Sequence, residues 1–317
     1  MIDVLAFGEP LVGFYPPHGA SLADDIPIKK IWGGDTSNVV LGIARLGGKS
    51  MYLTRVGDDP FGKGFINLWN RNGVDTSLIS IDPERRTGLY FVSFEGNRHS
   101  MTYHRTNSAA SAILPEEVDP GLLVQCRFLH LSGISLGMSQ AALRTGMYLM
   151  DLARKSNCKI SFDVNYRPAQ WRNPDFACQS ITAAIESGID ILEITDDEMS
   201  NLGWGDDPLS LQKRFPNIGT IAFRQGAKGS VVLQGRSVVS VPAIPVTVED
   251  TVGAGDSYDS GFLMATIMGM DIQEAAWFGT AAAALTCTGV GPLEKMPYMA
   301  DVQQLLETYR GQMIKTQ

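Results

Sequence analysis

The sequence is poor in cysteine, with four in 317 residues, and none of them falls in a C-x-x-C spacing. This scarcity predicts reduced thiols in a folded core and excludes a disulfide scaffold or a zinc ribbon. The four histidines also lack metal-ligand spacing. His130 lies in an apolar segment and is expected to be a hydrogen-bonded core residue.

Positive charge and long apolar runs are scarce as well. The 26 Lys and Arg residues are outnumbered by 34 Asp and Glu residues, for a net charge of −8, which disfavours nucleic acid and anionic membranes as partners. No apolar run reaches the roughly 20 residues of a membrane span. The opening MIDVLAFGEPLV lacks the basic start of a secretory signal. We therefore expect a cytoplasmic protein.

Two common nucleotide-binding motifs are missing. There is no G-x-x-x-x-G-K-[ST], and the segment GAGDSY lacks the third glycine of a dinucleotide fingerprint. That segment also comes near the end of the chain rather than in an opening βαβ unit. A P-loop enzyme and a nicotinamide-dependent dehydrogenase are therefore disfavoured.

Strand-like and helix-like segments alternate along most of the chain, which predicts a mainly parallel sheet covered on both faces. The expected strands are 2–8, 50–57, 127–133, 159–165, 188–195, 220–226 and 230–235, and the expected helices are 37–48, 61–74, 139–157 and a helical C-terminal third.

Residues 11–32 and 87–105 break this rhythm, because they alternate polar and apolar side chains with no helix between them. They predict a small additional sheet, acting as a lid, with a hairpin turn at FEGNRHS. The simplest organisation is one domain over 1–317 that carries this lid. An exposed lid sheet is also a candidate dimer surface.

The segment DTVGAGDSYDSGF places two glycines before an apolar helix. N–H groups exposed at such a helix start bind an anion. Asp256 would orient an attacking hydroxyl and take its proton, while the N–H groups of Gly253, Ala254 and Gly255 hold the charge on a transferring phosphoryl group. A loose transition state depends more on the alignment of the hydroxyl with the phosphoryl group than on a strong base, so Asp256 needs no raised pKa. The alternative is an N-capping aspartate after a flexible turn.

Two further motifs have the chemistry of a sugar site. In GGDTSN, glycines let a ligand approach the backbone and Asn38 offers an amide to hydroxyls, although a turn with a helix cap explains it as well. In YHR, Arg105 could fork onto a carboxylate beside the hydroxyls of Tyr90 and Tyr103. The alternative for YHR is an ordinary exposed strand end.

Three more motifs follow predicted strands. DVNYRP ends a strand at the ligand-binding edge of the sheet and makes Arg167 a second candidate anion clamp. TDDE gathers carboxylates suited to hydrated Mg²⁺, although Asp196 and Asp197 are better explained as complementing a helix dipole. RQGAKG is a tight turn between two predicted strands, which could border a nucleotide or could be a simple hairpin turn.

GGDTSN, DVNYR, the TDDE region, GAKG and above all DTVGAGD together resemble the ribokinase-like (PfkB) carbohydrate kinase family across nearly the whole chain. The resemblance implies ATP-dependent phosphoryl transfer to a sugar and a three-layer α/β/α domain with a mainly parallel central sheet and a β-sheet lid. It makes Asp256 the base and assigns Mg²⁺ to Glu198. It assigns the nucleotide side to Thr195, Arg224, Gly226, Lys228 and Gly229.

GEPLV, TGLY, YHRTNSAAS, LHLSGIS and SFDVNYRPAQW are similar to the versions in 2-keto-3-deoxygluconate kinases. This implies that the γ-phosphate of ATP goes to a primary hydroxyl of a 2-keto-3-deoxy sugar acid. Arg105 and Arg167 would hold its carboxylate. The other implied substrate contacts are Gly34, Asn38, Tyr90, Tyr103 and Ile134.

Several alternatives stay open. A kinase for a neutral sugar, such as fructose or ribose, or for a nucleoside would use the same base. A catalytically silent sugar-binding regulator of the same fold is a different class. The sequence also leaves open the configuration of the sugar acid and a requirement for a monovalent cation.

Overall fold

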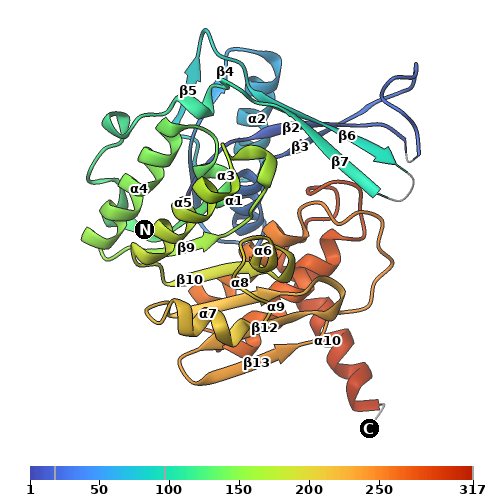
Figure 1. Ribbon diagram of the computed structural model, residues 1–317. Helices are drawn as coiled ribbons and strands as arrows, with labels where there is room; N and C mark the ends of the chain where they lie inside the picture. Colours follow the sequence, from blue (N-terminus) through green and yellow to red (C-terminus); the bar gives the residue numbers. More distant parts are fainter. Residues whose placement is uncertain (18, 96–97, 316–317) are drawn as a thin grey trace.

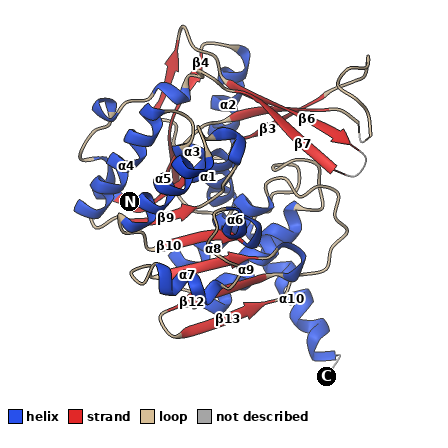
Figure 2. Ribbon diagram, viewed as in Figure 1, coloured by secondary structure: helices blue, strands red, loops and turns tan. Residues whose placement is uncertain are grey.

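The computed structural model describes residues 1–17, 19–95 and 98–315, which form a large and a small sheet with helices around the large one (Figures 1 and 2). The strands of the large sheet are β1 (Ile2–Phe7), β4 (Ser50–Gly57), β5 (Ile79–Asp82), β8 (Cys126–Ser132), β9 (Lys159–Asp163), β10 (Ile191–Thr195), β11 (Thr220–Arg224), β12 (Ser230–Gln234) and β13 (Ser237–Val241). Their order is β13-β12-β11-β10-β9-β8-β1-β4-β5. From β11 to β5 all neighbours are parallel, while β12 and β13 add an antiparallel edge.

Helices cover both faces of this sheet. They are α1 (Asp35–Arg45), α2 (Pro60–Arg71), α3 (Gly133–Leu136), α4 (Gln140–Lys155), α5 (Pro174–Glu186), α6 (Asp196–Asn201), α7 (Pro208–Arg214), α8 (Ala254–Ile267), α9 (Ile272–Thr286) and α10 (Met299–Lys315). Successive side chains of a strand point to opposite faces, so β1 contributes to two cores. Leu5 belongs to the core that also contains side chains of α4, α5 and α7, whereas Val4 belongs to the core that contains side chains of α1, α8 and α9. The result is the three-layer α/β/α arrangement expected from the sequence.

The small sheet lies to one side of the large one (Figure 1). It consists of β2 (Leu11–Tyr15), β3 (Lys29–Gly33), β6 (Gly88–Glu95) and β7 (Arg98–His104), in the order β3-β2-β6-β7. These strands fall within the two segments predicted to form it, except that β3 extends one residue further, to Gly33. The turn predicted at FEGNRHS includes Gly96 and Asn97, which lie outside the described residues.

Five helices and strands were not predicted: α3, α5, α7, β5 and β13. The C-terminal third was expected to be helical, but β13 precedes its first helix. His130 is buried as expected, and its Nδ1 lies 2.9 Å from Ser161 Oγ. In the described part of the chain, no helix has both the length and the hydrophobicity of a membrane span.

Candidate active site

Helix α8 begins with a turn that only glycine fits. Gly253 has a left-handed backbone, with φ of 83°, and an added Cβ would lie 2.3 Å from Pro292 Cβ. The N–H of Ala254 donates to the Thr251 carbonyl (3.2 Å), so it is engaged rather than open to an anion as predicted. At the next two positions, Gly255 and Asp256, helix geometry provides no intrahelical acceptor for the N–H groups.

Asp256 is the third residue of α8, so the alternative of an N-capping aspartate is wrong. Its carboxylate is buried, and Oδ2 accepts a 2.7 Å hydrogen bond from Asn38 Nδ2 of α1. Burial, followed by the nearby charge of Asp35, raises the pKa of Asp256 to about 7. This differs from the expectation that the base needs no raised pKa. The cause is that the first turn of α8 lies against α1 in the interior.

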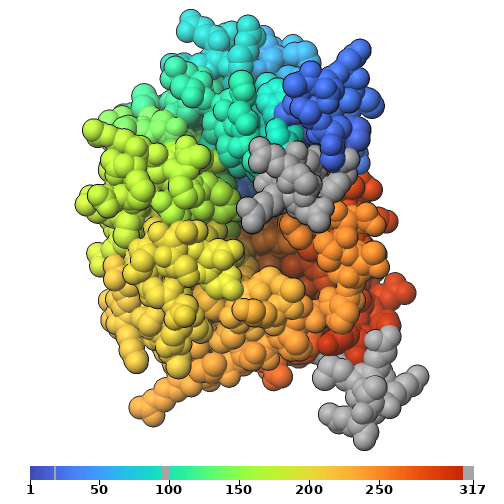
Figure 3. All heavy atoms as spheres, turned by 45° about the vertical axis from the view of Figure 1, so that its right-hand side comes forward, coloured from blue at the N-terminus to red at the C-terminus, as the bar shows by residue number. Residues whose placement is uncertain are grey.

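A cavity of about 980 Å³ lies at the carboxyl ends of the strands and beneath the small sheet. In Figure 3 the surface is hollowed there, with orange and red segments at its floor. Most of the residues predicted for the site line this cavity. They are Gly34, Asn38, Tyr90, Tyr103, Ile134, Arg167, Thr195, Glu198, Arg224, Gly226, Gly229, Gly253, Ala254, Gly255 and Asp256.

Two predicted residues do not line the cavity. Arg105 forms a buried ion pair with Glu9 (Nε to Oε2, 2.5 Å) and donates to Gln170 Oε1 (2.5 Å). Its guanidinium is therefore paired with Glu9 and Gln170 and does not line the cavity, which differs both from a carboxylate clamp and from an exposed strand end. Lys228 lies in the turn between β11 and β12 and is exposed, whereas Gly226 and Gly229 of the same turn reach the cavity.

Arg167 and Glu198, predicted for different roles, contact each other. Arg167 Nη1 donates to Glu198 Oε1 (3.0 Å), and the Arg167 side chain is 47% exposed. Glu198 Oε2 accepts from the N–H of Thr195, which caps α6 in return through its hydroxyl. Burial raises the pKa of Glu198, and the charge of Asp163 adds to the rise. Thr195 and Glu198 thus have a structural function at the start of α6.

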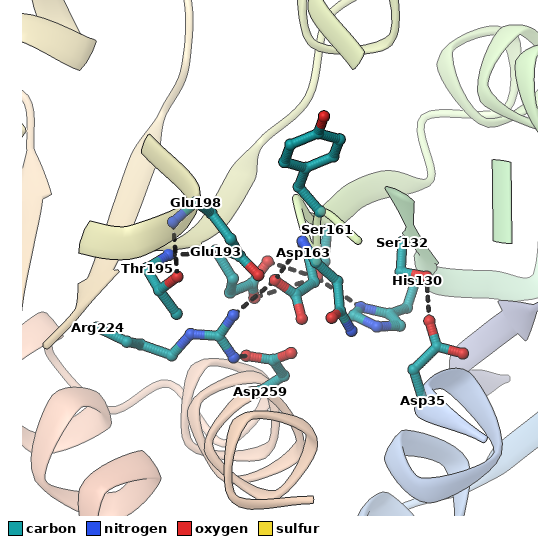
Figure 4. Close-up of polar contacts among 12 residues, drawn as sticks. Asp35, His130, Ser132, Ser161, Asp163, Glu193, Thr195, Glu198, Arg224 and Asp259 are labelled. Atoms are coloured by element: carbon teal, nitrogen blue, oxygen red, sulfur yellow. Dashed lines mark hydrogen bonds and ion pairs between the residues drawn. The ribbon is translucent and has the colours of Figure 1, made fainter. Parts of the chain in front are cut away.

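A buried polar network lies beside the floor of the cavity (Figure 4). Arg224 donates to Asp163 Oδ1 (2.6 Å) and to Asp259 Oδ1 (2.8 Å). Next to it, the Ser161 hydroxyl lies within 3.2 Å of Glu193 Oε1, in an interior where burial raises the pKa of Glu193 to about 8. Arg224 was predicted to contact a nucleotide, but its guanidinium is buried between two carboxylates.

Sequence reasoning missed Asp35, Asp163, Asp259 and Glu9. Asp35 lines the cavity, accepts a hydrogen bond from the Ser132 hydroxyl, and has no partner for Oδ1 in the described part of the chain. Asp35 and Asp163 stand inside the motifs GGDTSN and DVNYRP, so their position was available. Asp259 follows Asp256 by three residues, which places it on the same side of α8.

Comparisons with known proteins agree with this geometry. A family model described as pfkB family carbohydrate kinase matches residues 1–298. The probable fructokinase-7 of Arabidopsis thaliana is 33% identical over 97% of this chain and 93% of its own length. The 2-dehydro-3-deoxygluconokinase of Thermoproteus tenax is 30% identical over 97% of this chain and 95% of its own length.

Solved structures agree as well. A PfkB protein from Polaromonas sp. JS666 is 26% identical, with a TM-score of 0.86 over 96% of this chain and 99% of that chain. The expectations of a ribokinase-like α/β fold and of an ATP-dependent carbohydrate kinase are confirmed. The chain belongs to the pfkB family of carbohydrate kinases.

Proposed function

We propose that this kinase transfers the γ-phosphate of ATP to a primary hydroxyl of a 2-keto-3-deoxy sugar acid, with Asp256 as the base. One observation carries the proposal. Asp256 lines the cavity at the first turn of a helix, held there by Asn38, where N–H groups without intrahelical acceptors can bind an anion.

In the proposed step, the sugar hydroxyl gives its proton to Asp256 as its oxygen forms a bond to the γ-phosphorus. The bond from that phosphorus to the bridging oxygen breaks, and ADP leaves with the electron pair. The N–H groups at the start of α8 stabilise the charge on the phosphoryl oxygens during transfer. Gly226 and Gly229 border the nucleotide on the opposite wall.

Buried acceptors suit a sugar in this cavity. Asp35 Oδ1 and Asn38 Oδ1 are buried, belong to residues that line the cavity, and have no partner among the described residues. A buried acceptor without a donor is costly, and sugar hydroxyls would satisfy both. Tyr90 and Tyr103 add hydroxyls on the side of the small sheet.

The residues present fit a hydrated magnesium ion. Mg²⁺ keeps several waters and needs only one or two carboxylates besides phosphate, so it requires no cluster of acidic residues. In residues 1–17, 19–95 and 98–315, no such cluster of three metal-ligating side chains is found. Glu198 would hold the ion, which would supply positive charge to the phosphates when bound.

The sugar acid is favoured by Arg167, which is half exposed at the cavity and can offer donors beyond the one that Glu198 takes. A second candidate is a neutral sugar such as fructose. It is favoured by the ion pair of Arg105 with Glu9, which removes one of the two expected carboxylate ligands. The relatives support both, since one is named a probable fructokinase and another is named a 2-dehydro-3-deoxygluconokinase.

Replacing Arg167 separates these candidates. Arg167→Gln removes a charge-assisted hydrogen bond, so we expect KM for 2-keto-3-deoxygluconate to rise about 10- to 100-fold. For fructose we expect less than about a threefold change. Steady-state ADP release with Mg-ATP measures both, and Arg172→Gln, an exposed arginine outside the cavity, is the matched control. Equal losses on both sugars would exclude a carboxylate role for Arg167.

The raised pKa of Asp256 predicts a pH dependence. The base acts as a carboxylate, so kcat/KM is expected to fall about tenfold for each pH unit below about 7. Asp35 and Asp163 oppose ionisation of Asp256, while Asn38 and Arg224 favour it. A rate profile that stays flat down to about pH 5 would contradict Asp256 as the base.

A further inference from the structure

Arg224 occupies an unusual place for a buried arginine. It is the last residue of β11, is 8% exposed, and reaches the start of α8 across the carboxyl edge of the sheet. One arm of its guanidinium binds Asp163 at the end of β9, and the other binds Asp259 on α8 (Figure 4). The guanidinium therefore connects the first two turns of α8 to the central sheet by hydrogen bonds.

The same guanidinium packs against the turn that forms the anion hole. A Cβ added at Gly255 would lie 2.8 Å from Arg224 Nη1, so the missing side chain of Gly255 is what lets the cation approach the backbone. A cation held at this place limits how strongly the carboxylates of Asp163 and Asp259 repel an anion bound at the helix start.

Stability alone does not explain this arginine. A buried ion pair is a weak stabiliser compared with apolar residues of similar volume. Arg224 Nε also has no hydrogen-bond partner in the described part of the chain, which adds a cost. Such a costly group at the edge of a ligand cavity points to a role in the reaction.

We propose that Arg224 is a positioning residue for phosphoryl transfer, which fixes the start of α8 against β9 behind the anion hole. The inference rests on the phosphoryl-transfer step proposed above. Arg224 does not contact the reacting atoms in this account, because Asp163 and Asp259 hold its guanidinium.

A double variant that conserves net charge tests the proposal. Arg224→Gln with Asp259→Asn removes one cation and one of its two carboxylate partners, so the formal net charge of the cluster is unchanged. We expect this protein to fold but its kcat to fall about 100-fold, with KM for ATP and sugar changed less than about threefold. The acid limb of its pH profile should move upward, because the lost Arg224 favours the carboxylate of Asp256, whereas the opposing charge of Asp259 is not among the main influences on the pKa of Asp256. Asp259→Asn alone keeps an oxygen that can accept from Arg224 but loses its charge, so its kcat should lie between those of the wild type and the double variant.

Arg224→Lys adds an intermediate case, since it keeps the charge but loses the two-armed bridge. We expect its kcat to lie between those of the wild type and the double variant. A double variant with wild-type kcat and pH profile would show that Arg224 only neutralises Asp259. If the double variant does not fold, equal kcat for Arg224→Lys and wild type would overturn the proposal. A wild-type enzyme that phosphorylates no sugar would instead contradict the proposed function.

Discussion

Asp256→Asn is expected to lower kcat by about 1,000-fold, since a positioned general base contributes about 10²- to 10⁴-fold. Asparagine keeps the size of the side chain and a partner for Asn38, but it cannot take the proton of the sugar hydroxyl. Mg-ATP affinity should change less than about threefold, because the nucleotide wall is untouched. Coupled ADP release measures kcat, and calorimetry measures ATP binding.

The free energy of unfolding of Asp256→Asn provides the control, because it shows that the variant is folded. The pKa of Asp256 is raised in the folded protein, so the wild type loses stability as pH rises from about 4 to about 7. The substituted amide carries no charge and avoids that loss. We therefore expect Asp256→Asn to be more stable than the wild type at pH 8, by on the order of 3 kcal/mol, and to gain nothing near pH 4. Near-normal turnover in this folded variant would exclude Asp256 as the base.

Gly253→Ala is expected to have the second largest effect. The added Cβ would overlap Pro292, and alanine is strained at a φ of 83°. The turn must shift, and a displacement of about 1 Å at a reacting group can cost about 100-fold in kcat. Overpacking together with backbone strain should also lower the free energy of unfolding by about 2–4 kcal/mol.

Gly269→Ala is the matched control for that variant. Gly269 follows the other end of α8 and is also left-handed, with φ of 81°, but no atom lies within 4 Å of an added Cβ. It should lose only about 1 kcal/mol of stability and keep normal kcat. If both variants retain activity equally, the shape of the turn at Gly253 is not needed for catalysis.

Much of the fold could be predicted because the parallel strands are buried on both faces and read as apolar runs. The elements missed had weaker patterns. Helix α5 begins shortly after the irregular stretch NYRPAQW, although Asn173 and Pro174 form a recognisable helix start. β13 is a short edge strand with exposed side chains, joined to β12 across Gly235. Edge strands lack the burial that makes the pattern visible.

The motifs predicted which residues surround the cavity but not how they pair. Arg105 with Glu9 and Arg167 with Glu198 are ion pairs between distant segments. The raised pKa of Asp256 likewise depends on the packing of α1 beside α8. Asn38 and Asp256, whose side chains meet there, are 218 positions apart in the sequence. Such effects arise from tertiary distances that motif spacing does not contain. Assembly through the small sheet, a cytoplasmic location and a monovalent cation stay predictions.

The most direct test of the central claim is phosphorus NMR of the reaction of the wild type and Asp256→Asn with Mg-ATP and 2-keto-3-deoxygluconate. We expect the wild type to convert the γ-phosphate into a phosphomonoester whose signal couples to the two protons of a primary carbon. The same signal should be absent with Asp256→Asn over the same time. No phosphomonoester with the wild type, or equal formation by both proteins, would contradict the account.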